Sequence, residues 1–165
     1  MKSVRVDLSI AGLGIVIVDA QELRISPGDD FFSANLADAL GVVRTFSAHF
    51  ITGFATGSPG SYSVWLQTGH PTEESTAVYP MRLRLPFRCC SGEIQLRDLY
   101  DFMSWDPSPA HDVIVLDPGS YILYVFSRRP ESGIIGDDQE ILICIDKCDD
   151  LAPYVLSGIP VLREL

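Results

Sequence analysis

Apolar and polar positions alternate along several short segments of the chain, a pattern typical of β-strands that bury one face. Residues 4–10 alternate aliphatic side chains with polar ones, and residues 78–87 contain an alternation of apolar residues and arginines. The run 13–18 is apolar at every position except one glycine, which indicates a strand covered on both faces. We expect residues 4–10 and 13–18 to form an opening hairpin.

A tight turn followed by a strand is predicted twice. Residues 117–121 read DPGSY and precede the apolar run 122–127, and the letters PGSY occur again at 59–62, before another apolar run. Proline fixes the φ angle of the first corner of a turn, and glycine supplies the positive φ of the second. We expect the strand after residue 121 to be a central strand of the core.

One convincing helix is predicted over residues 29–41. Asp29 and Asp30 suit an N-terminal cap, apolar residues follow at four-residue spacing, and Gly41 is a C-terminal stop. Residues 99–103 indicate one further helical turn. With turn signals about every ten residues, the pattern favours a mainly β protein: an antiparallel β-sandwich of about eight strands with one short helix, formed by residues 1–165 as a single domain.

The chain is acidic, with 22 Asp and Glu against 12 Lys and Arg and a net charge of −10. Hydrophobic residues make up 47% and charged residues 21%, which excludes general disorder. The charge repels phosphate backbones and anionic lipids, so we expect no direct nucleic-acid binding and no membrane association. No secretory signal is recognisable, and we expect a cytoplasmic protein with reduced cysteines.

The negative charge is concentrated in two segments. Residues 98–117 contain five Asp and no Lys or Arg, and residues 137–150 contain six acidic residues and one Lys. If both segments lie at one end of a sandwich, they form a single acidic patch that binds a basic protein. The predicted partner-binding residues are Asp98, Asp101, Asp106, Asp112, Asp137, Asp138, Asp149 and Asp150.

No motif for catalysis or cofactor binding is present: the sequence lacks G-x-S-x-G, a phosphate-binding glycine loop and H-E-x-x-H. We therefore expect no enzymatic activity and no cofactor. His49 lies among apolar residues and is interpreted as a core or strand residue. A hydrolase that uses His70 or His111 with a nearby carboxylate, such as Asp112 beside His111, is the third hypothesis.

Two sets of residues are candidates for metal binding. Cys89, Cys90, Cys144 and Cys148 would supply four sulfurs for zinc, but their spacing departs from paired C-x2-C motifs, and a free Cys in an apolar strand behaves as a small hydrophobe. The adjacent acids at 137–138 and 149–150 lack the alternate-residue oxygen spacing of an EF-hand calcium loop. Solvated turns and buried thiols are the preferred interpretation, with no metal.

The order of elements between residues 78 and 130 resembles that of a known family. A strand ends in LRLPF at 83–87, a short turn leads to GEIQL at 92–96, and VIVLDPGSY at 113–121 enters a long strand that closes at 129–130. This arrangement resembles competence protein J and related small bacterial proteins. The resemblance implies a β-sandwich that binds and inhibits a nuclease.

The resemblance and the charge lead to the same functional hypothesis. A nuclease presents a basic groove to its substrate, and an acidic protein can occlude that groove without covalent chemistry. We expect an inhibitor or immunity protein that blocks a bacterial nuclease or another toxin. The alternative is a β-sandwich ligand-binding or structural adaptor module, in which the aromatic-rich, uncharged segment 45–72 partly lines a cleft.

Overall fold

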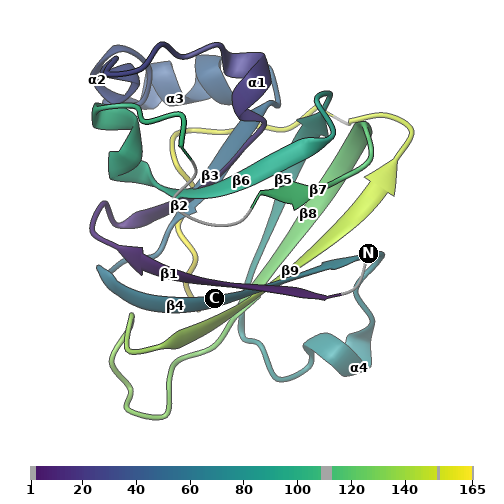
Figure 1. The fold of residues 1–165 in the computed structure, drawn as a ribbon. Coiled ribbons are helices and arrows are strands. Elements are labelled where there is room, and N and C mark those ends of the chain that lie inside the picture. Colours follow the sequence, from purple (N-terminus) through teal and green to yellow (C-terminus); the bar gives the residue numbers. More distant parts are fainter. Residues whose placement is uncertain (1–2, 109–112, 152, 165) are drawn as a thin grey trace.

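The computed structural model describes residues 3–108, 113–151 and 153–164, and this part of the chain forms nine strands in two sheets (Figure 1). The five-stranded sheet has the order β1 (Val4–Ile10), β4 (Gly60–Thr68), β9 (Gln139–Cys148), β8 (Gly119–Ser127), β5 (Met81–Cys89). The four-stranded sheet has the order β3 (Ile51–Ala55), β2 (Gly14–Val18), β6 (Glu93–Asp98), β7 (Ile114–Val115). The mainly β prediction is confirmed.

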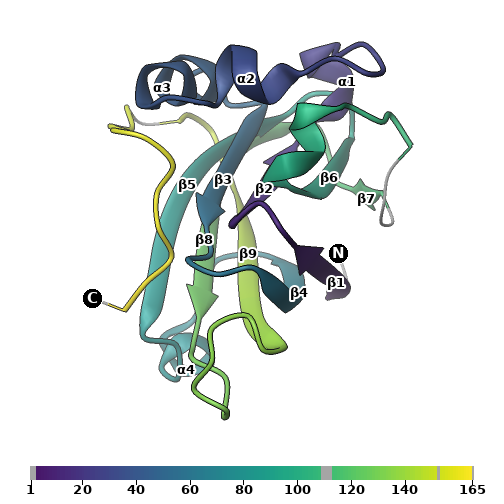
Figure 2. The ribbon, with the colours of Figure 1, turned by 90° about the vertical axis from the view of Figure 1, so that its left-hand side faces the viewer.

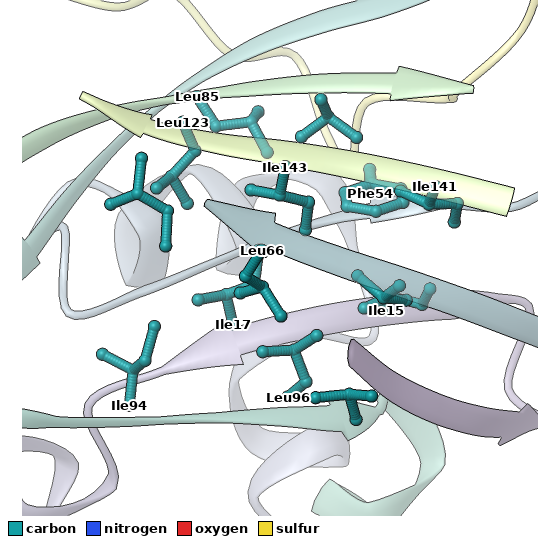
Figure 3. Packing of buried hydrophobic residues seen from close by; sticks show 14 of the residues in the cluster. Ile15, Ile17, Phe54, Leu66, Leu85, Ile94, Leu96, Leu123, Ile141 and Ile143 are labelled. Carbon is teal, nitrogen blue, oxygen red and sulfur yellow. The ribbon is translucent and has the colours of Figure 1, made fainter. Parts of the chain in front are cut away.

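The core lies between the two sheets. Leu66, Leu123 and Ile143 of the five-stranded sheet pack against residues such as Ile15 and Ile17 of the four-stranded sheet, and all five side chains are at most 1% exposed (Figure 3). The strands bring one face of each sheet to this interface because their side chains alternate between faces. In β2 every residue is buried, since helices cover its other face.

The predicted opening hairpin is wrong, because β1 and β2 belong to different sheets. β1 pairs with β4, whereas β2 pairs with β3 and β6. Leu13 has a left-handed φ of 60° in the connection, which turns the chain from one sheet to the other. The sandwich is also not purely antiparallel, since β4 and β9 are parallel neighbours.

The single helix predicted over residues 29–41 is also wrong, because two helices occupy this region. Helix α2 (Phe31–Asn35) ends before Asp38, which is extended and accepts a hydrogen bond from Gly41 N to cap α3 (Ala39–Phe46). The other helices are α1 (Ala20–Leu23), α4 (Glu73–Thr76) and the 3₁₀ helix η1 (Leu99–Met103). None of the described helices is long and apolar enough to cross a membrane.

The helices form a third layer on one side. Helices α1 to α3 and η1 lie over the outer face of the four-stranded sheet, where Val16, Val18 and Ile51 pack against Phe46 and Phe102. Helix α4 lies at the opposite end of the molecule, beside the five-stranded sheet (Figure 2). Much of the outer face of the five-stranded sheet is therefore left without a helical layer.

The repeated PGSY segments begin two strands, β4 and β8, that lie on either side of β9. In each copy the tyrosine is buried and its hydroxyl donates a hydrogen bond to the carbonyl four residues earlier, from Tyr62 to Ser58 O at 2.7 Å and from Tyr121 to Asp117 O at 2.5 Å. The repeat thus marks two turns closed by the same contact. The prediction of a strand within the core after residue 121 is confirmed.

Candidate functional site

Asp98, one of the predicted partner-binding residues, holds together two segments that are distant in sequence. Its carboxylate accepts hydrogen bonds from the backbone N–H groups of Ala11 at 2.7 Å, Gly12 at 2.9 Å and Tyr100 at 3.1 Å. The last of these bonds caps η1, and the first two fix the connection between β1 and β2. The carboxylate of Asp98 is therefore largely engaged within the protein.

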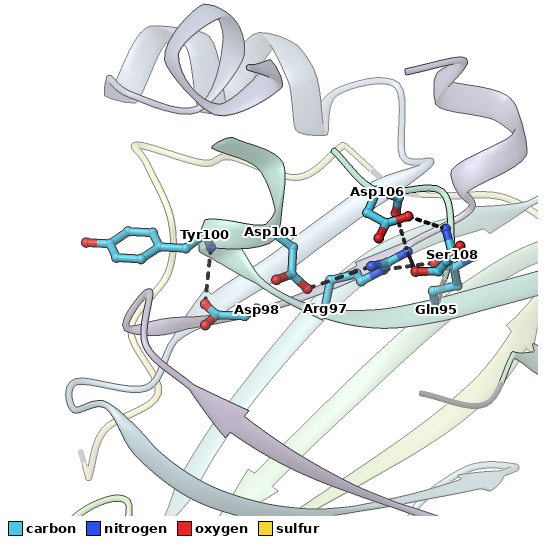
Figure 4. A network of polar contacts seen from close by, with 7 residues as sticks. All are labelled: Gln95, Arg97, Asp98, Tyr100, Asp101, Asp106 and Ser108. Carbon is cyan, nitrogen blue, oxygen red and sulfur yellow. Dashed lines mark hydrogen bonds and ion pairs between the residues drawn. The ribbon is translucent and has the colours of Figure 1, made fainter. Parts of the chain in front are cut away.

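A buried arginine organises the segment that follows Asp98. Arg97 is 3% exposed, and its guanidinium carbon lies 4.5 Å from the ring centroid of Trp105 (Figure 4). It donates to the carbonyls of Asp106 at 3.0 Å and Ser108 at 3.3 Å, and lies 3.9 Å from the Asp101 carboxylate. Burial lowers the pKa of Arg97, and the carboxylates of Asp101 and Asp106 oppose that shift. These carboxylates offset the cost of a buried cation.

The structure places two further acids, which the sequence analysis treated as helix caps, beside this segment. Trp105 N donates to Asp29 O at 3.0 Å, and Gly28 N donates to Trp105 O at 2.8 Å, so the loop before α2 is joined to the loop after η1. Asp30 caps α2 through Ser33 N. No pattern in the sequence indicates this junction, because the two segments are more than seventy positions apart.

Exposed apolar side chains lie among these carboxylates. Tyr100 is 46% exposed and its ring meets that of Phe32 edge-on at 6.2 Å, and Figure 4 shows Tyr100 pointing away from the body of the protein. Met103 and Leu13 are each 45% exposed. We call this region the η1 surface, formed by Leu13, Asp29, Asp30, Phe32, Asp98, Tyr100, Asp101, Met103 and Asp106.

The other predicted acids lie away from one another. Asp137 and Asp138 precede β9 and Asp149 and Asp150 follow it, so the ten-residue strand separates the two pairs by about 30 Å at ~3.3 Å per residue. The segment 137–150 therefore does not form a single acidic patch. Asp112 lies outside the described residues.

Asp137 and Asp138 share their surroundings with arginines. Together with Arg128 and Arg129 they line a surface cavity of about 520 Å³, and the Asp138 carboxylate accepts a hydrogen bond from Ser63 Oγ at 2.9 Å. Charges of both signs occur in this cavity. On the η1 surface, by contrast, the acids occur together with exposed aromatic and aliphatic side chains.

Of the two histidines that a hydrolase would use, His70 lies in the described part of the chain. His70 Nδ1 lies 2.8 Å from the Asp146 carboxylate, and the His70 side chain is 68% exposed. Such a pair orients an imidazole, and a hydrolase also requires a nucleophile or an activated water. His111 lies outside the described residues. The interpretation of His49 as a core or strand residue is wrong, because it lies half-buried in the bend between α3 and β3 with a left-handed φ of 66°. Its Nδ1 atom is buried without a hydrogen-bond partner.

The four cysteines do not converge. Cys89 faces the core between the sheets, whereas Cys144 belongs to the apolar cluster on the outer face of the five-stranded sheet. Across the described residues no group of three or more His, Cys, Asp or Glu side chains is arranged to hold a metal ion. All four cysteines are free thiols, and burial raises the pKa of Cys89 to about 11.

The aromatic segment 45–72 contributes to the core. Phe46, Phe54 and Tyr62 are at most 3% exposed and pack in the two main apolar clusters. Trp65 instead lies half-buried on the outer face of the five-stranded sheet, where Arg5 stacks over its ring at 5.6 Å. Phe46, Phe54 and Tyr62 thus belong to the core, whereas Trp65 and Gln67 line a surface cavity of about 340 Å³, so the segment lines a cleft only in part.

Asp19 is a buried acid that sequence reasoning missed. It is fully buried at the end of β2, and its Oδ2 accepts hydrogen bonds from Cys90 N at 2.8 Å and Ser91 N at 2.9 Å. Its Oδ1 has no hydrogen-bond partner. Asp19 therefore ties the turn between β5 and β6 to the end of β2.

The sequence matches no protein-family model and no curated protein. Solved structures with a similar fold include ComJ from Bacillus subtilis, an inhibitor of the DNA-degrading activity of NucA, with a TM-score of 0.57 and 13% identity over 89% of this chain and 98% of that one. The product of crocagin biosynthetic gene J is also similar, with a TM-score of 0.55 and 16% identity over 87% and 96% of the two chains. At these identities the likeness shows the fold: the chain has a ComJ-like fold.

Proposed function

We propose that this chain is a non-catalytic binding protein that inhibits a bacterial nuclease, or another toxin, by covering its basic substrate groove. The observation that carries the proposal is the ComJ-like fold, which extends over most of both chains and belongs in ComJ to a nuclease inhibitor. The net charge of −10 supports it independently, since a groove that holds phosphates attracts carboxylates.

The η1 surface is the proposed contact surface. Interfaces gain most of their affinity from a few aromatic or other large side chains near the centre, and charged groups at the rim accelerate association. Tyr100 and Met103 supply exposed apolar area of this kind, Asp101 lies between them in the chain, and Asp29 and Asp106 belong to the two loops that are joined beside η1. Asp137, Asp138, Asp149 and Asp150 lie farther away, and their proposed role is to attract a basic partner over longer range.

An inhibition assay tests this function. NucA and a panel of other basic bacterial nucleases are mixed with plasmid DNA and increasing amounts of the protein. Stoichiometric loss of DNA cleavage for at least one nuclease is expected, with affinity that falls as salt is raised. Full cleavage by every nuclease at a large excess of the protein, together with no binding in calorimetry, would contradict the nuclease-inhibitor proposal.

Matched double variants test the contact surface. Asp29→Lys with Tyr100→Ala changes one exposed acid and one exposed aromatic residue on the η1 surface, and we expect affinity for the inhibited nuclease to fall on the order of 50-fold. Asp149→Lys with Tyr154→Ala makes the same chemical change elsewhere and should weaken binding only slightly. Equal losses in the two variants would exclude the η1 surface as the contact region.

A further inference from the structure

The outer face of the five-stranded sheet carries arginines stacked on aromatic rings. On the neighbouring strands β5 and β8, Arg82 lies opposite Phe126 and Arg84 lies opposite Tyr124. The guanidinium carbons are 5.8 Å and 5.7 Å from the ring centroids of these partners. Stacking occupies the flat face of a guanidinium and leaves N–H groups at its edge able to donate. The guanidinium groups of Arg82 and Arg84 therefore lie side by side, each stacked on an aromatic ring.

These four side chains line a surface pocket of about 370 Å³ between the sheet and α4, a size within the range of small-ligand sites. The α4 side of the pocket is formed by Pro71, Thr72, Glu73 and Thr76. Helix α4, which contributes to this pocket, lies at the end of the molecule opposite helices α1 to α3 (Figures 1 and 2).

The pocket is held in place by hydrogen bonds across it. Arg82 donates from Nε to Tyr79 O at 3.1 Å and from Nη2 to Thr76 O at 3.2 Å, which ties the segment after α4 to β5. Thr72 and Ser75 form a reciprocal capping box at the start of α4. Because these groups of the protein are already ordered, the protein itself loses little conformational entropy when a ligand binds.

Arg82 and Arg84 form no ion pair with a side chain in the described part of the chain. The ion pairs there involve Arg5, Arg97, Arg128, Arg129 and His70, and none includes Arg82 or Arg84. Arg84 in particular is exposed and stacks on Tyr124. In a protein with an excess of ten acidic residues, two arginines without carboxylate partners beside an apolar floor favour a ligand that brings its own carboxylates.

We propose that this pocket binds a short acidic peptide segment. A carboxylate of the peptide pairs with the Arg84 guanidinium, assisted by Arg82, and an apolar side chain packs on the half-buried Tyr124. Glu73, on the opposite wall, offers carboxylate oxygens that accept hydrogen bonds from the N–H groups of a peptide backbone, donors that a phosphodiester backbone lacks. This site is separate from the η1 surface and does not depend on the proposed inhibition.

Fluorescence anisotropy with defined peptides tests the site. The probe is a fluorescein-labelled Glu-Asp-Phe-Asp-Glu peptide with blocked ends, and the control peptide replaces each acid by its amide. Saturable binding of the acidic peptide, at least tenfold tighter than that of the amide peptide, is expected. Absence of binding, or equal binding of both peptides, would overturn the proposal.

Variants locate the binding. Arg84→Gln removes the charge, makes no change to the core and should weaken peptide binding at least tenfold, whereas the matched control Arg44→Gln, in the last turn of α3, should leave it unchanged. Equal binding by wild type and Arg84→Gln would place the peptide elsewhere. Tighter, Arg84-dependent binding of a single-stranded oligothymidine would replace the peptide by nucleic acid. Nuclease inhibition should persist in Arg84→Gln, which separates this proposal from the first.

Discussion

Replacement of Asp98 by alanine separates a structural role of this carboxylate from a role in partner binding. The side chain accepts three backbone N–H bonds, two from the connection between β1 and β2 and one that caps η1. Loss of a helix cap costs about 1 kcal/mol, and each of the other two bonds to a half-exposed charged acceptor is worth roughly 1 kcal/mol. We therefore expect the free energy of unfolding to fall by about 3 kcal/mol.

Urea denaturation followed by tryptophan fluorescence measures this change, and the midpoint of thermal unfolding should fall by about 6–12 °C. Asp150→Ala is the matched control, because this exposed carboxylate follows β9 and should leave stability unchanged. Folded Asp98→Ala protein, kept at low temperature, should still bind its partner through the rest of the η1 surface. Unfolding free energy that is indistinguishable from the wild type would refute the assigned structural role.

Three further predictions concern other parts of the fold. Burial lowers the pKa of His49, so the unfolded chain binds the proton more tightly than the folded protein, and stability is lost as the pH falls below about 6.5. His49→Asn, which tolerates the left-handed φ of 66°, should make the free energy of unfolding depend less on pH in urea titrations between pH 7 and 5. The same pH dependence in the wild type and the variant would contradict this prediction. With its pKa raised to about 11, Cys89 should resist alkylation at pH 8 until the protein unfolds, whereas exposed Cys90 should react at once, as mass spectrometry can show. Gly136→Ala would bring Cβ within 2.4 Å of the backbone oxygen of Pro59, at a φ of 87°. It should therefore lower the urea midpoint more than Gly133→Ala, where φ is 75° and no atom lies within 4 Å of the added Cβ; equal midpoints would refute the steric argument.

The two PGSY segments show how local sequence fixed part of this fold. Proline, glycine and tyrosine in that order set the turn, and the tyrosine hydroxyl closes it on a carbonyl four residues away. Alternation likewise placed β1 and β5, because the period of side-chain direction is a property of the strand itself. Turn chemistry and periodicity depend on near neighbours in the chain, so they can be recognised in the sequence without the tertiary structure.

The partners of the strands and the grouping of the acids depended on residues far apart in sequence. Periodicity shows that 4–10 and 13–18 are strands, but the sheet to which each belongs follows from packing and from Asp98, which holds their connection from 86 positions away. The length of β9 separates the acids at its two ends. The hydrogen bond from Trp105 N to Asp29 O brings two further acids, Asp29 and Asp30, to the η1 surface. The amino-acid sequence by itself determined a β-rich, acidic protein with two tyrosine-closed turns; only the tertiary structure decided which carboxylates are neighbours and which arginines remain without them, because those distances are set by the packing of the two sheets.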